Sequence, residues 1–162
     1  MSTLAQFTSA GLIIPELRGR DAGAVLAELG SALHREGRVI DLPRFHSAVM
    51  HREQLSSTAM PPGWAIPHAR MEELPQLSLA VGRSSEPLVW LGGSQTRVRL
   101  VFLFAVPESA AGAYLGLVSA LARLSRSAGH VERLIQATDS QTILAVLEEM
   151  PLRQSRSAGV AG

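Results

Sequence analysis

The run Leu100–Val106, LVFLFAV, constrains the fold more than any other stretch of this 162-residue chain. It belongs to the segment Arg97–Phe104 (RVRLVFLF), which alternates at first and then becomes wholly apolar. A strand that is apolar on both faces is typical of the centre of a sheet. The run is also far shorter than the ~20 residues that a helix needs to span a bilayer. It therefore predicts a buried central strand.

Helical and strand patterns alternate along the rest of the chain. Asp21 is expected to cap a helix that Gly37 ends, and Asp41 to cap a second helix with Pro43 in its first turn. The other expected elements are a short strand over Leu12–Leu17, a loop over Ser56–Gly63, a short extended run over Trp64–Ile66, a strand over Gln76–Val81, and helices over Ser109–Ser127, His130–Gln136 and Ser140–Glu149. This mixture predicts an α/β sandwich with no internal linker. We expect one domain over residues 1–150 and a flexible C-terminal tail over 151–162.

Charge and cysteine content exclude several classes of function. Fifteen basic and 14 acidic residues give a net charge of +1, and the arginines are scattered. Proteins that bind nucleic acid usually carry a clustered basic excess. The chain has no cysteine, so it has no disulfide, no thiolate nucleophile and no cysteine-based metal site. Its first residues, MSTLAQFTSAGLIIPEL, lack the basic start and long apolar region of a secretory signal. We therefore expect a cytoplasmic protein that neither binds nucleic acid nor inserts into a membrane.

The segment Trp64–Arg70, WAIPHAR, contains the most unusual histidine of the chain. Pro67 fixes its own φ angle and favours extended backbone at Ile66. His68 therefore follows a strand on a backbone with little freedom. If the chain stays extended, Arg70 shares a side with His68, because alternate residues of a strand face the same way.

An anion site can be assembled around His68 from nearby residues. Arg52 lies near the end of the second expected helix, and the following loop could fold it back towards the histidine. The planar guanidinium of arginine binds two phosphoryl oxygens at once. Ser56, Ser57 and Thr58, with the amides of the Gly/Pro loop, could complete a cradle. A neutral imidazole is a good nucleophile near physiological pH, so the residues fit a phosphorylatable histidine. By composition alone, an ordinary surface turn fits as well.

Longer sequence patterns favour the phosphorylatable histidine. The stretch GRVIDLPRFHSAVMHREQLSSTAMPPGWAIPHAR, Gly37–Arg70, resembles the EIIA domain of the bacterial phosphotransferase system, in its fructose–mannitol and nitrogen-regulatory group. The shared pattern is an Arg-Glu pair closing a helix, a Ser/Thr-containing glycine loop and Ala-Ile-Pro-His-Ala-Arg. VFLFAVPE at Val101–Glu108 and ALARLS at Ala120–Ser125 match as well. The resemblance covers about residues 5–150.

The resemblance implies a fold, partners and roles for particular residues. It implies a central mixed β-sheet flanked by helices on both faces, and no metal or organic cofactor. His68 would accept a phosphoryl group through Nε2 from an HPr-like phosphocarrier, with Arg52 compensating the phosphoryl charge. It would then pass the group to an EIIB domain or hold it as a regulatory mark. Thr58 would be a loop contact, and Ser57 and Arg70 are further candidates for contact with the phosphoryl group.

Tyr114 departs from the pattern of the family. Such domains usually carry a second histidine inside the helix after the VPE segment, where this chain reads AYLGLV. A tyrosine can donate one hydrogen bond, but it stays neutral and offers no imidazolium to the transition state. The alternative is a packing role, because Tyr114 shares a helical face with Val118, Leu121 and Leu124.

The other histidines and the tryptophans carry weaker signals. His46 and His51 diverge by ~140° on a helix and make a poor metal pair. His34 and His130 fall in expected helix ends, where an interaction with the helix terminus explains them. Trp64 and Trp90 are interpreted as packing residues.

Three functions remain open from the sequence. The first is a phosphocarrier in sugar transport, which hands its phosphoryl group to EIIB. The second is a nitrogen-type regulator, whose affinity for its target protein depends on phosphorylation of His68. The third is a degenerate EIIA-like binding module with little or no phosphoryl transfer.

Overall fold

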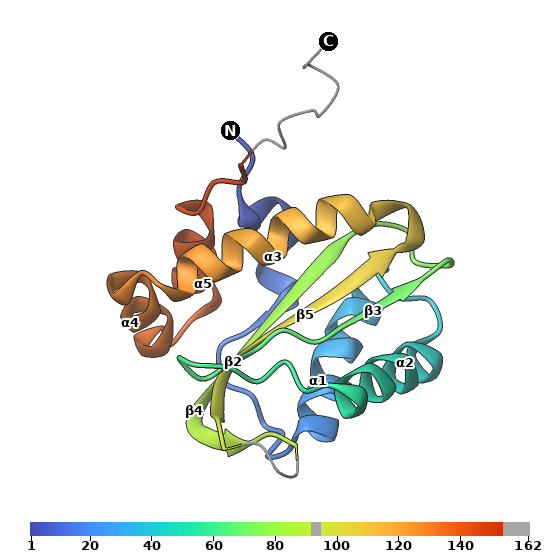
Figure 1. Ribbon diagram of the computed structural model, residues 1–162, viewed down its shortest axis with the longest axis horizontal. Coiled ribbons are helices and arrows are strands. Elements are labelled where there is room, and N and C mark those ends of the chain that lie inside the picture. Colours follow the sequence, from blue (N-terminus) through green and yellow to red (C-terminus); the bar gives the residue numbers. More distant parts are fainter. Residues whose placement is uncertain (92–94, 154–162) are drawn as a thin grey trace.

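The computed structural model describes residues 1–91 and 95–153 and contains a five-stranded mixed sheet (Figure 1). The strands are β1 (Ile13–Ile14), β2 (Trp64–Ala65), β3 (His68–Met71), β4 (Ser78–Val89) and β5 (Arg97–Pro107). Their order is β1-β4-β5-β2, and β3 also pairs with β5. Among the strands that the structure describes, only β4 and β5 pair in antiparallel fashion; β1 runs parallel to β4, and β2 and β3 run parallel to β5.

Strand β5 is the centre of the molecule, as its apolar sequence predicts. Leu100, Phe102, Phe104 and Val106 point into one hydrophobic core, while Val101, Leu103 and Ala105 point into the other. Each of these seven side chains is completely buried. Because β5 is paired on both edges and covered on both faces, an unbroken apolar run suits it.

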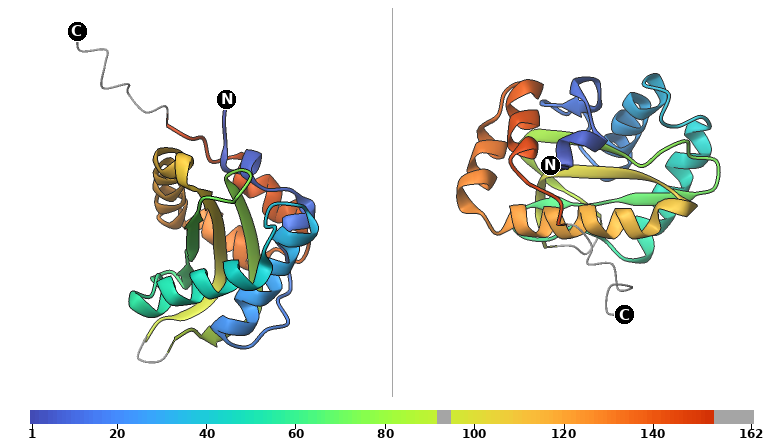
Figure 2. Two further views of the ribbon diagram at one scale, coloured as in Figure 1. Left: turned by 90° about the vertical axis from the view of Figure 1, so that its right-hand side faces the viewer. Right: turned by 90° about the horizontal axis from the view of Figure 1, so that it is seen from above.

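The helices cover both faces of the sheet. They are α1 (Ala22–Arg35), α2 (Leu42–Leu55), α3 (Ala111–Ser125), α4 (Ala128–Gln136) and α5 (Ser140–Glu148). Helices α1 and α2 pack on one face, and α3, α4 and α5 contribute to the core on the other (Figure 2). This arrangement confirms the predicted α/β class with helices on both sides of a mixed sheet.

The first two helices begin and end where the sequence predicts. The side chain of Asp21 accepts a hydrogen bond from the Ala24 amide, and that of Asp41 accepts one from the Arg44 amide. Both bonds satisfy amides that a helix start leaves unpaired. Gly37 follows α1 with a φ of +73°, a conformation that glycine adopts without strain.

Several expected elements differ from those observed. The strand expected over Leu12–Leu17 is reduced to the two residues of β1, and His68 does not follow a strand but begins one, β3. Strand β4 continues to Val89 instead of ending at Val81, with a register irregularity between Arg83 and Leu88. Its polar sequence GRSSEP hides the strand because it contains this irregularity and has no alternating pattern, and pairing with β5 resumes only at Leu88 and Val89. Helix α3 begins at Ala111 and not at Ser109, because residues Glu108–Ala110 form a 3-10 turn after Pro107.

The two ends of the described chain lie close together. The Leu4 amide donates to the Met150 carbonyl at 3.2 Å, and Thr3 forms a β-bridge with Pro151. Most of the expected C-terminal tail, residues 154–162, lies outside the described residues. Among the helices that the structure describes, none has the length and apolarity to cross a membrane.

Candidate functional site

His68 is the first residue of β3 and pairs with Phe104 of β5. The preceding backbone is fixed at two points. The Pro67 carbonyl accepts a hydrogen bond from the Phe104 amide at 3.0 Å, and the Ile66 amide donates to Thr58 Oγ1 at 2.8 Å. A proline between two anchored groups leaves little freedom, so the restraint on His68 that the sequence predicts is present.

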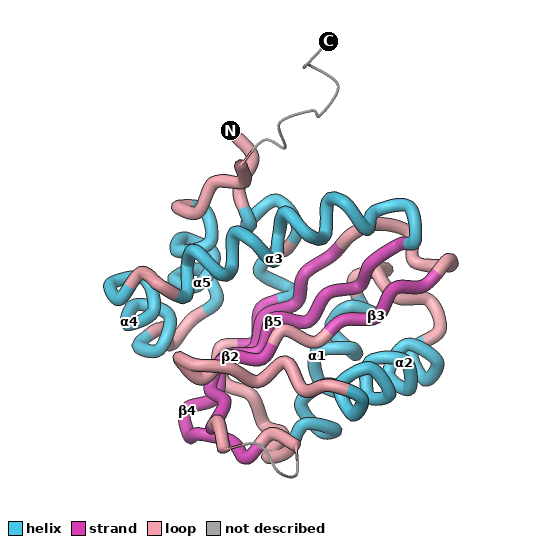
Figure 3. The backbone as a smooth tube through the Cα atoms, in the orientation of Figure 1, coloured by secondary structure: helices cyan, strands magenta, loops and turns pink. Residues whose placement is uncertain are grey.

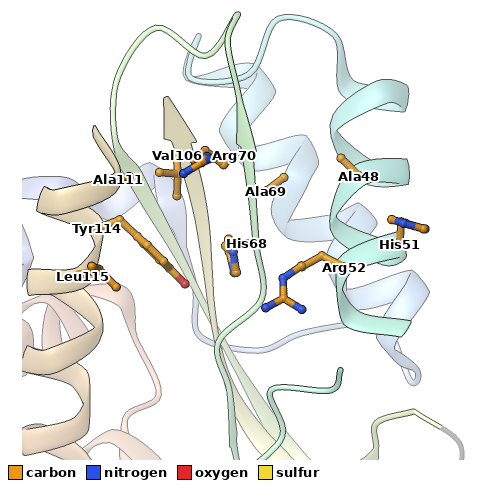
Figure 4. A pocket seen from close by; sticks show the side chains of 10 residues that line it. All are labelled: Ala48, His51, Arg52, His68, Ala69, Arg70, Val106, Ala111, Tyr114 and Leu115. Atoms are coloured by element: carbon orange, nitrogen blue, oxygen red, sulfur yellow. The ribbon is translucent and has the colours of Figure 1, made fainter. Parts of the chain in front are cut away.

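A cavity of about 540 Å³ opens above this histidine (Figure 4). Its polar and large lining residues are His51 and Arg52 from α2, His68 and Arg70 from β3, and Tyr114 and Leu115 from α3. Alanine and valine side chains complete the wall. The Arg52 guanidinium extends towards the His68 ring, whereas the His51 ring points away from it (Figure 4). Arg52 and Arg70 thus lie where the sequence predicts them, in one cavity with His68.

The surroundings of His68 favour a neutral imidazole. Burial, and then the positive charges of Arg52 and Arg70, hold the pKa of His68 below its ordinary value of 6.5. Its Nδ1 atom is buried and has no hydrogen-bond partner among the described residues. A neutral ring has an unprotonated nitrogen available for nucleophilic attack, and the two guanidinium groups suit an anionic reaction partner.

Tyr114 faces His68 directly. Their ring centroids lie 4.9 Å apart with an interplanar angle of 34°, and the tyrosine also meets Phe104 edge-on at 5.3 Å. Burial raises the pKa of Tyr114 to about 12, with the Arg52 charge lowering that pKa and the Glu53 charge raising it. The hydroxyl therefore stays protonated at physiological pH. The residue both packs and lines the cavity, so the two interpretations of Tyr114 are compatible.

Ser57 and Thr58 do not line the cavity. Thr58 Oγ1 points inward to accept from the Ile66 amide, and Ser57 Oγ accepts from the Ala59 amide at 3.2 Å. Their loop runs from the end of α2 to β2 (Figure 3) and contains a cis peptide bond between Pro61 and Pro62. A direct contact between either hydroxyl and a phosphoryl group stays a prediction.

Two residues near the site escaped the sequence analysis. His51 lines the cavity, although its spacing from His46 indicated only a poor metal pair. Glu53 is 1% exposed and accepts hydrogen bonds from the Thr58 amide and the Trp90 indole. The Arg-Glu pair was a signal for Glu53, but nothing in the sequence shows that its carboxylate turns inward.

The remaining histidines have local partners. His34 Nδ1 lies 2.8 Å from the Val39 carbonyl and His46 Nε2 lies 3.1 Å from the Gly23 carbonyl. The described residues contain no group of three metal-binding side chains. His130 lies near the start of α4, where the helix terminus does not favour a cation, so that interpretation is wrong for this residue. It contacts Ser127 and Glu149 instead.

The tryptophans pack as predicted, with one addition. Trp64 is fully buried with its ring centroid 4.7 Å from that of Phe102. Trp90 is buried in the opposite core, and its indole also donates to Glu53 Oε2 at 2.8 Å.

Comparisons with known proteins agree with this geometry. Residues 6–150 match the family model for "Phosphoenolpyruvate-dependent sugar phosphotransferase system, EIIA 2". The chain is 30% identical over 114 residues to the fructose-specific EIIA component of Haloferax volcanii, covering 70% of this chain and 74% of that protein. It is 26% identical over 133 residues to the fructose-specific EIIABC component of Bacillus subtilis, covering 82% of this chain but only 21% of that longer protein.

A solved structure has the same fold. The nitrogen regulatory protein IIA-Ntr of Neisseria meningitidis superposes with a TM-score of 0.77 and 25% identity, covering 88% of this chain and 97% of the other.

The fold and the site thus define an α/β domain with a histidine in a cavity that two arginines also line. Its chain belongs to the EIIA 2 family of the phosphoenolpyruvate-dependent sugar phosphotransferase system. Domains of this family are phosphotransfer components, and its members include sugar-specific and nitrogen-regulatory proteins.

Proposed function

We propose that this protein is a histidine phosphocarrier in which His68 receives a phosphoryl group from the phosphohistidine of an HPr-like carrier. The observation that carries the proposal is the position of the His68 ring, restrained by Pro67 and shared by a cavity with Arg52 and Arg70. Family membership supports the donor class. The cytoplasmic location stays a prediction.

Nε2 is the nitrogen that would accept the group. Nδ1 of His68 is buried, so an incoming phosphorus atom would meet Nε2 first. The Nε2 lone pair would form the new P–N bond while the P–N bond of the donor breaks, and the donor imidazole would leave with that electron pair. The lowered pKa keeps the ring neutral, and the ring would react in the tautomer that carries its single proton on Nδ1, which leaves the Nε2 lone pair free.

Arg52 and Arg70 would stabilise the transferring group electrostatically. Phosphoryl transfer depends mainly on alignment and on compensation of charge over the phosphoryl oxygens. The Tyr114 hydroxyl would add one neutral donor from the opposite wall. Phosphohistidine at position 68 would then pass its group to an EIIB domain or alter the affinity of the protein for a regulatory target.

The regulatory function is a second candidate that Tyr114 favours. Tyr114 occupies the wall facing His68 and stays uncharged, whereas the family pattern expects a second histidine there. A charged donor stabilises an oxyanion-rich transition state more than a neutral one. Slow transfer from phosphorylated His68 to a partner would let the phosphoryl group persist as a regulatory mark. A domain in which transfer is lost altogether would be the degenerate binding module.

Incubation with the general phosphotransferase proteins and labelled phosphoenolpyruvate tests the proposal. We expect acid-labile label on the wild-type protein, transferable to an added EIIB domain if the protein is a relay. Label that stays on the protein in the presence of EIIB would favour the regulatory function. Absence of label under conditions that phosphorylate HPr would contradict the phosphocarrier proposal and support the degenerate module.

A further inference from the structure

Glu53 is a buried carboxylate with an incomplete set of partners. Its side chain lies at the end of α2, one residue after Arg52, and is 1% exposed. Oε2 accepts two hydrogen bonds, from the Thr58 amide at 3.0 Å and from Trp90 Nε1 at 2.8 Å. Oε1 is buried and has no hydrogen-bond partner among the described residues.

Burying this carboxylate costs free energy, so stability alone does not explain why the position holds a glutamate. A buried carboxylate loses its hydration, and well-packed apolar residues of similar size are often as stable in such positions. Glu53 contacts Trp90, a residue of the core that α1 and α2 cover, and is not a lining residue of the cavity. A direct role in binding the phosphoryl group therefore does not explain it.

A continuous set of hydrogen bonds joins Glu53 to the backbone of His68. Glu53 Oε2 holds the Thr58 amide, and Thr58 Oγ1 holds the Ile66 amide at 2.8 Å. Ile66 is followed by Pro67, which cannot rotate about its own φ angle and whose carbonyl is held by β5. The path thus runs through groups that have little freedom and ends at the catalytic candidate.

The same carboxylate stands beside the second functional side chain. Because Arg52 precedes Glu53 in the last turn of α2, anchoring Glu53 to Trp90, the residue that follows β4, also fixes the helix end that carries Arg52. The charge of Glu53 reaches the opposite wall too: after burial and Arg52, it is the third influence on the pKa of Tyr114.

We propose that Glu53 is a positioning residue for phosphoryl transfer, which fixes the His68 backbone through Thr58 and Ile66 and the Arg52 helix end through Trp90. The inference rests on the proposed phosphocarrier function and extends it to a buried residue that does not touch the phosphoryl group. Misplacement of reacting groups by about 1 Å can cost on the order of 10²-fold in rate, so such a residue has a measurable effect.

Four variants separate this role from ordinary stabilisation. Glu53→Met keeps the size but removes the acceptor, whereas Glu53→Gln keeps an oxygen that can accept both N–H groups. Thr58→Val removes the acceptor of the Ile66 amide and keeps the shape of the side chain. Ser84→Ala is the matched control, because Ser84 is also a buried polar residue, whose hydroxyl donates to the Glu86 carbonyl away from the cavity.

The first measurement is the rate of phosphoryl acceptance from a phosphorylated HPr-like carrier. We expect the maximal rate to fall at least about tenfold in Glu53→Met and Thr58→Val, with the KM for the carrier unchanged because the outer surface is intact. Glu53→Gln should stay within about threefold of wild type, and Ser84→Ala should lose thermal stability without losing rate. The double variant Glu53→Met/Thr58→Val should be no slower than Glu53→Met alone, because Glu53→Met already breaks the path that runs through Thr58.

The second measurement does not depend on a protein donor. Amide hydrogen exchange at Ile66 should accelerate in Glu53→Met and Thr58→Val but not in Ser84→Ala. Phosphoramidate, a small phosphoryl donor, should label His68 more slowly in the first two variants. If HPr-like carriers fail to label the wild type, the proposed function fails, while these two readouts still decide the role of Glu53.

Several results would overturn the inference. One is a folded Glu53→Met variant whose rate of phosphoryl acceptance and whose hydrogen exchange at the Ile66 amide both equal those of the wild type. Another is a Glu53→Gln variant that accepts the phosphoryl group as slowly as Glu53→Met. Additive losses in the double variant would show that Thr58 acts by direct contact instead. If Glu53→Met does not fold, the Thr58→Val variant decides instead. Wild-type hydrogen exchange at the Ile66 amide together with a wild-type rate of phosphoryl acceptance in that variant would reject the path from Glu53 to His68.

Discussion

The two walls of the cavity differ in chemistry although each is one face of a helix. The α2 wall contributes His51 and Arg52, and its next residue is the buried Glu53. The α3 wall contributes an alanine, Tyr114 and Leu115, which carry no formal charge. Charge compensation for a phosphoryl group is thus concentrated on α2 and β3, whereas α3 supplies a ring against His68 and an apolar rim. Changes on the α2 side should therefore alter chemistry more than changes on the α3 side.

The largest loss of phosphoryl transfer is expected from a change at His68, which lies on β3 between the two helical walls. His68→Ala removes the nucleophile, so all acid-labile phosphoryl label should disappear while the protein remains folded. The measurement is labelling with phosphoenolpyruvate and the general phosphotransferase proteins, with a thermal melt as control. Label that persists in this variant would move the acceptor to another histidine, and His51 would then be the first to test.

Arg52→Lys probes the charged wall. Lysine keeps the charge but loses the planar two-point contact with phosphoryl oxygens. Loss of one charged donor can cost ~10²-fold or more, and the retained charge should limit the fall in acceptance rate to between about 10- and 100-fold. The melting temperature should stay nearly constant. Equal rates in the two proteins would mean that Arg52 is only a solvated residue at the end of α2.

Tyr114→His and Tyr114→Phe probe the uncharged wall. A histidine at this position would introduce a group that can be cationic, so acceptance should become a few-fold faster. Removing only the hydroxyl in Tyr114→Phe should change the rate little, because a neutral donor contributes less. The measurements are the rate of phosphoryl acceptance and the melting temperature of both variants. A folded Tyr114→Phe protein with far slower transfer would show that the hydroxyl performs the role of the missing histidine.

The smallest expected effect is a shift in pH dependence. The lowered pKa of His68 keeps the ring neutral to a lower pH than usual, and acceptance should decline only as pH falls through that value. Arg70 is the third-ranked cause of this lowering, after burial and Arg52. Arg70→Gln should therefore raise the pKa of His68 slightly and move the acid decline to higher pH. An NMR titration of the His68 ring measures the shift, and a shift to lower pH would contradict the electrostatic account.

The sequence predicted the elements whose signals are local. Asp21 and Asp41 cap helices through amides three residues away, and the run Leu100–Val106 is apolar because both of its faces are buried. The extension of β4 to Val89 was missed because it crosses a polar irregularity, after which Leu88 and Val89 pair with β5 again. Backbone pairing between β4 and β5 does not require any particular side chains, so the sequence of β4 does not reveal it.

At the site, sequence reasoning located His68, Arg52 and Arg70 but not the supporting network. The restraint on His68 could be predicted because Pro67 acts on its immediate neighbours. The direction of Thr58 Oγ1, towards the Ile66 amide and not towards the cavity, depends on how the loop after α2 folds. The sequence does not show whether a threonine hydroxyl in such a loop holds a backbone amide or faces a ligand.

The sequence by itself determined the starts of α1 and α2, the central strand and the restrained histidine, because caps, periodicity and proline geometry act within a few residues. It also determined the family, through the motif around His68. Only the tertiary structure decided that Tyr114, 46 positions beyond His68, lies 4.9 Å from its ring. It also decided that Glu53 is buried against Trp90. The first contact follows from the parallel pairing of β3 with β5, because α3 follows β5 in the chain. The second depends on the packing of the end of α2 beside the end of β4. Contacts between segments so far apart in the chain leave no local pattern in the sequence.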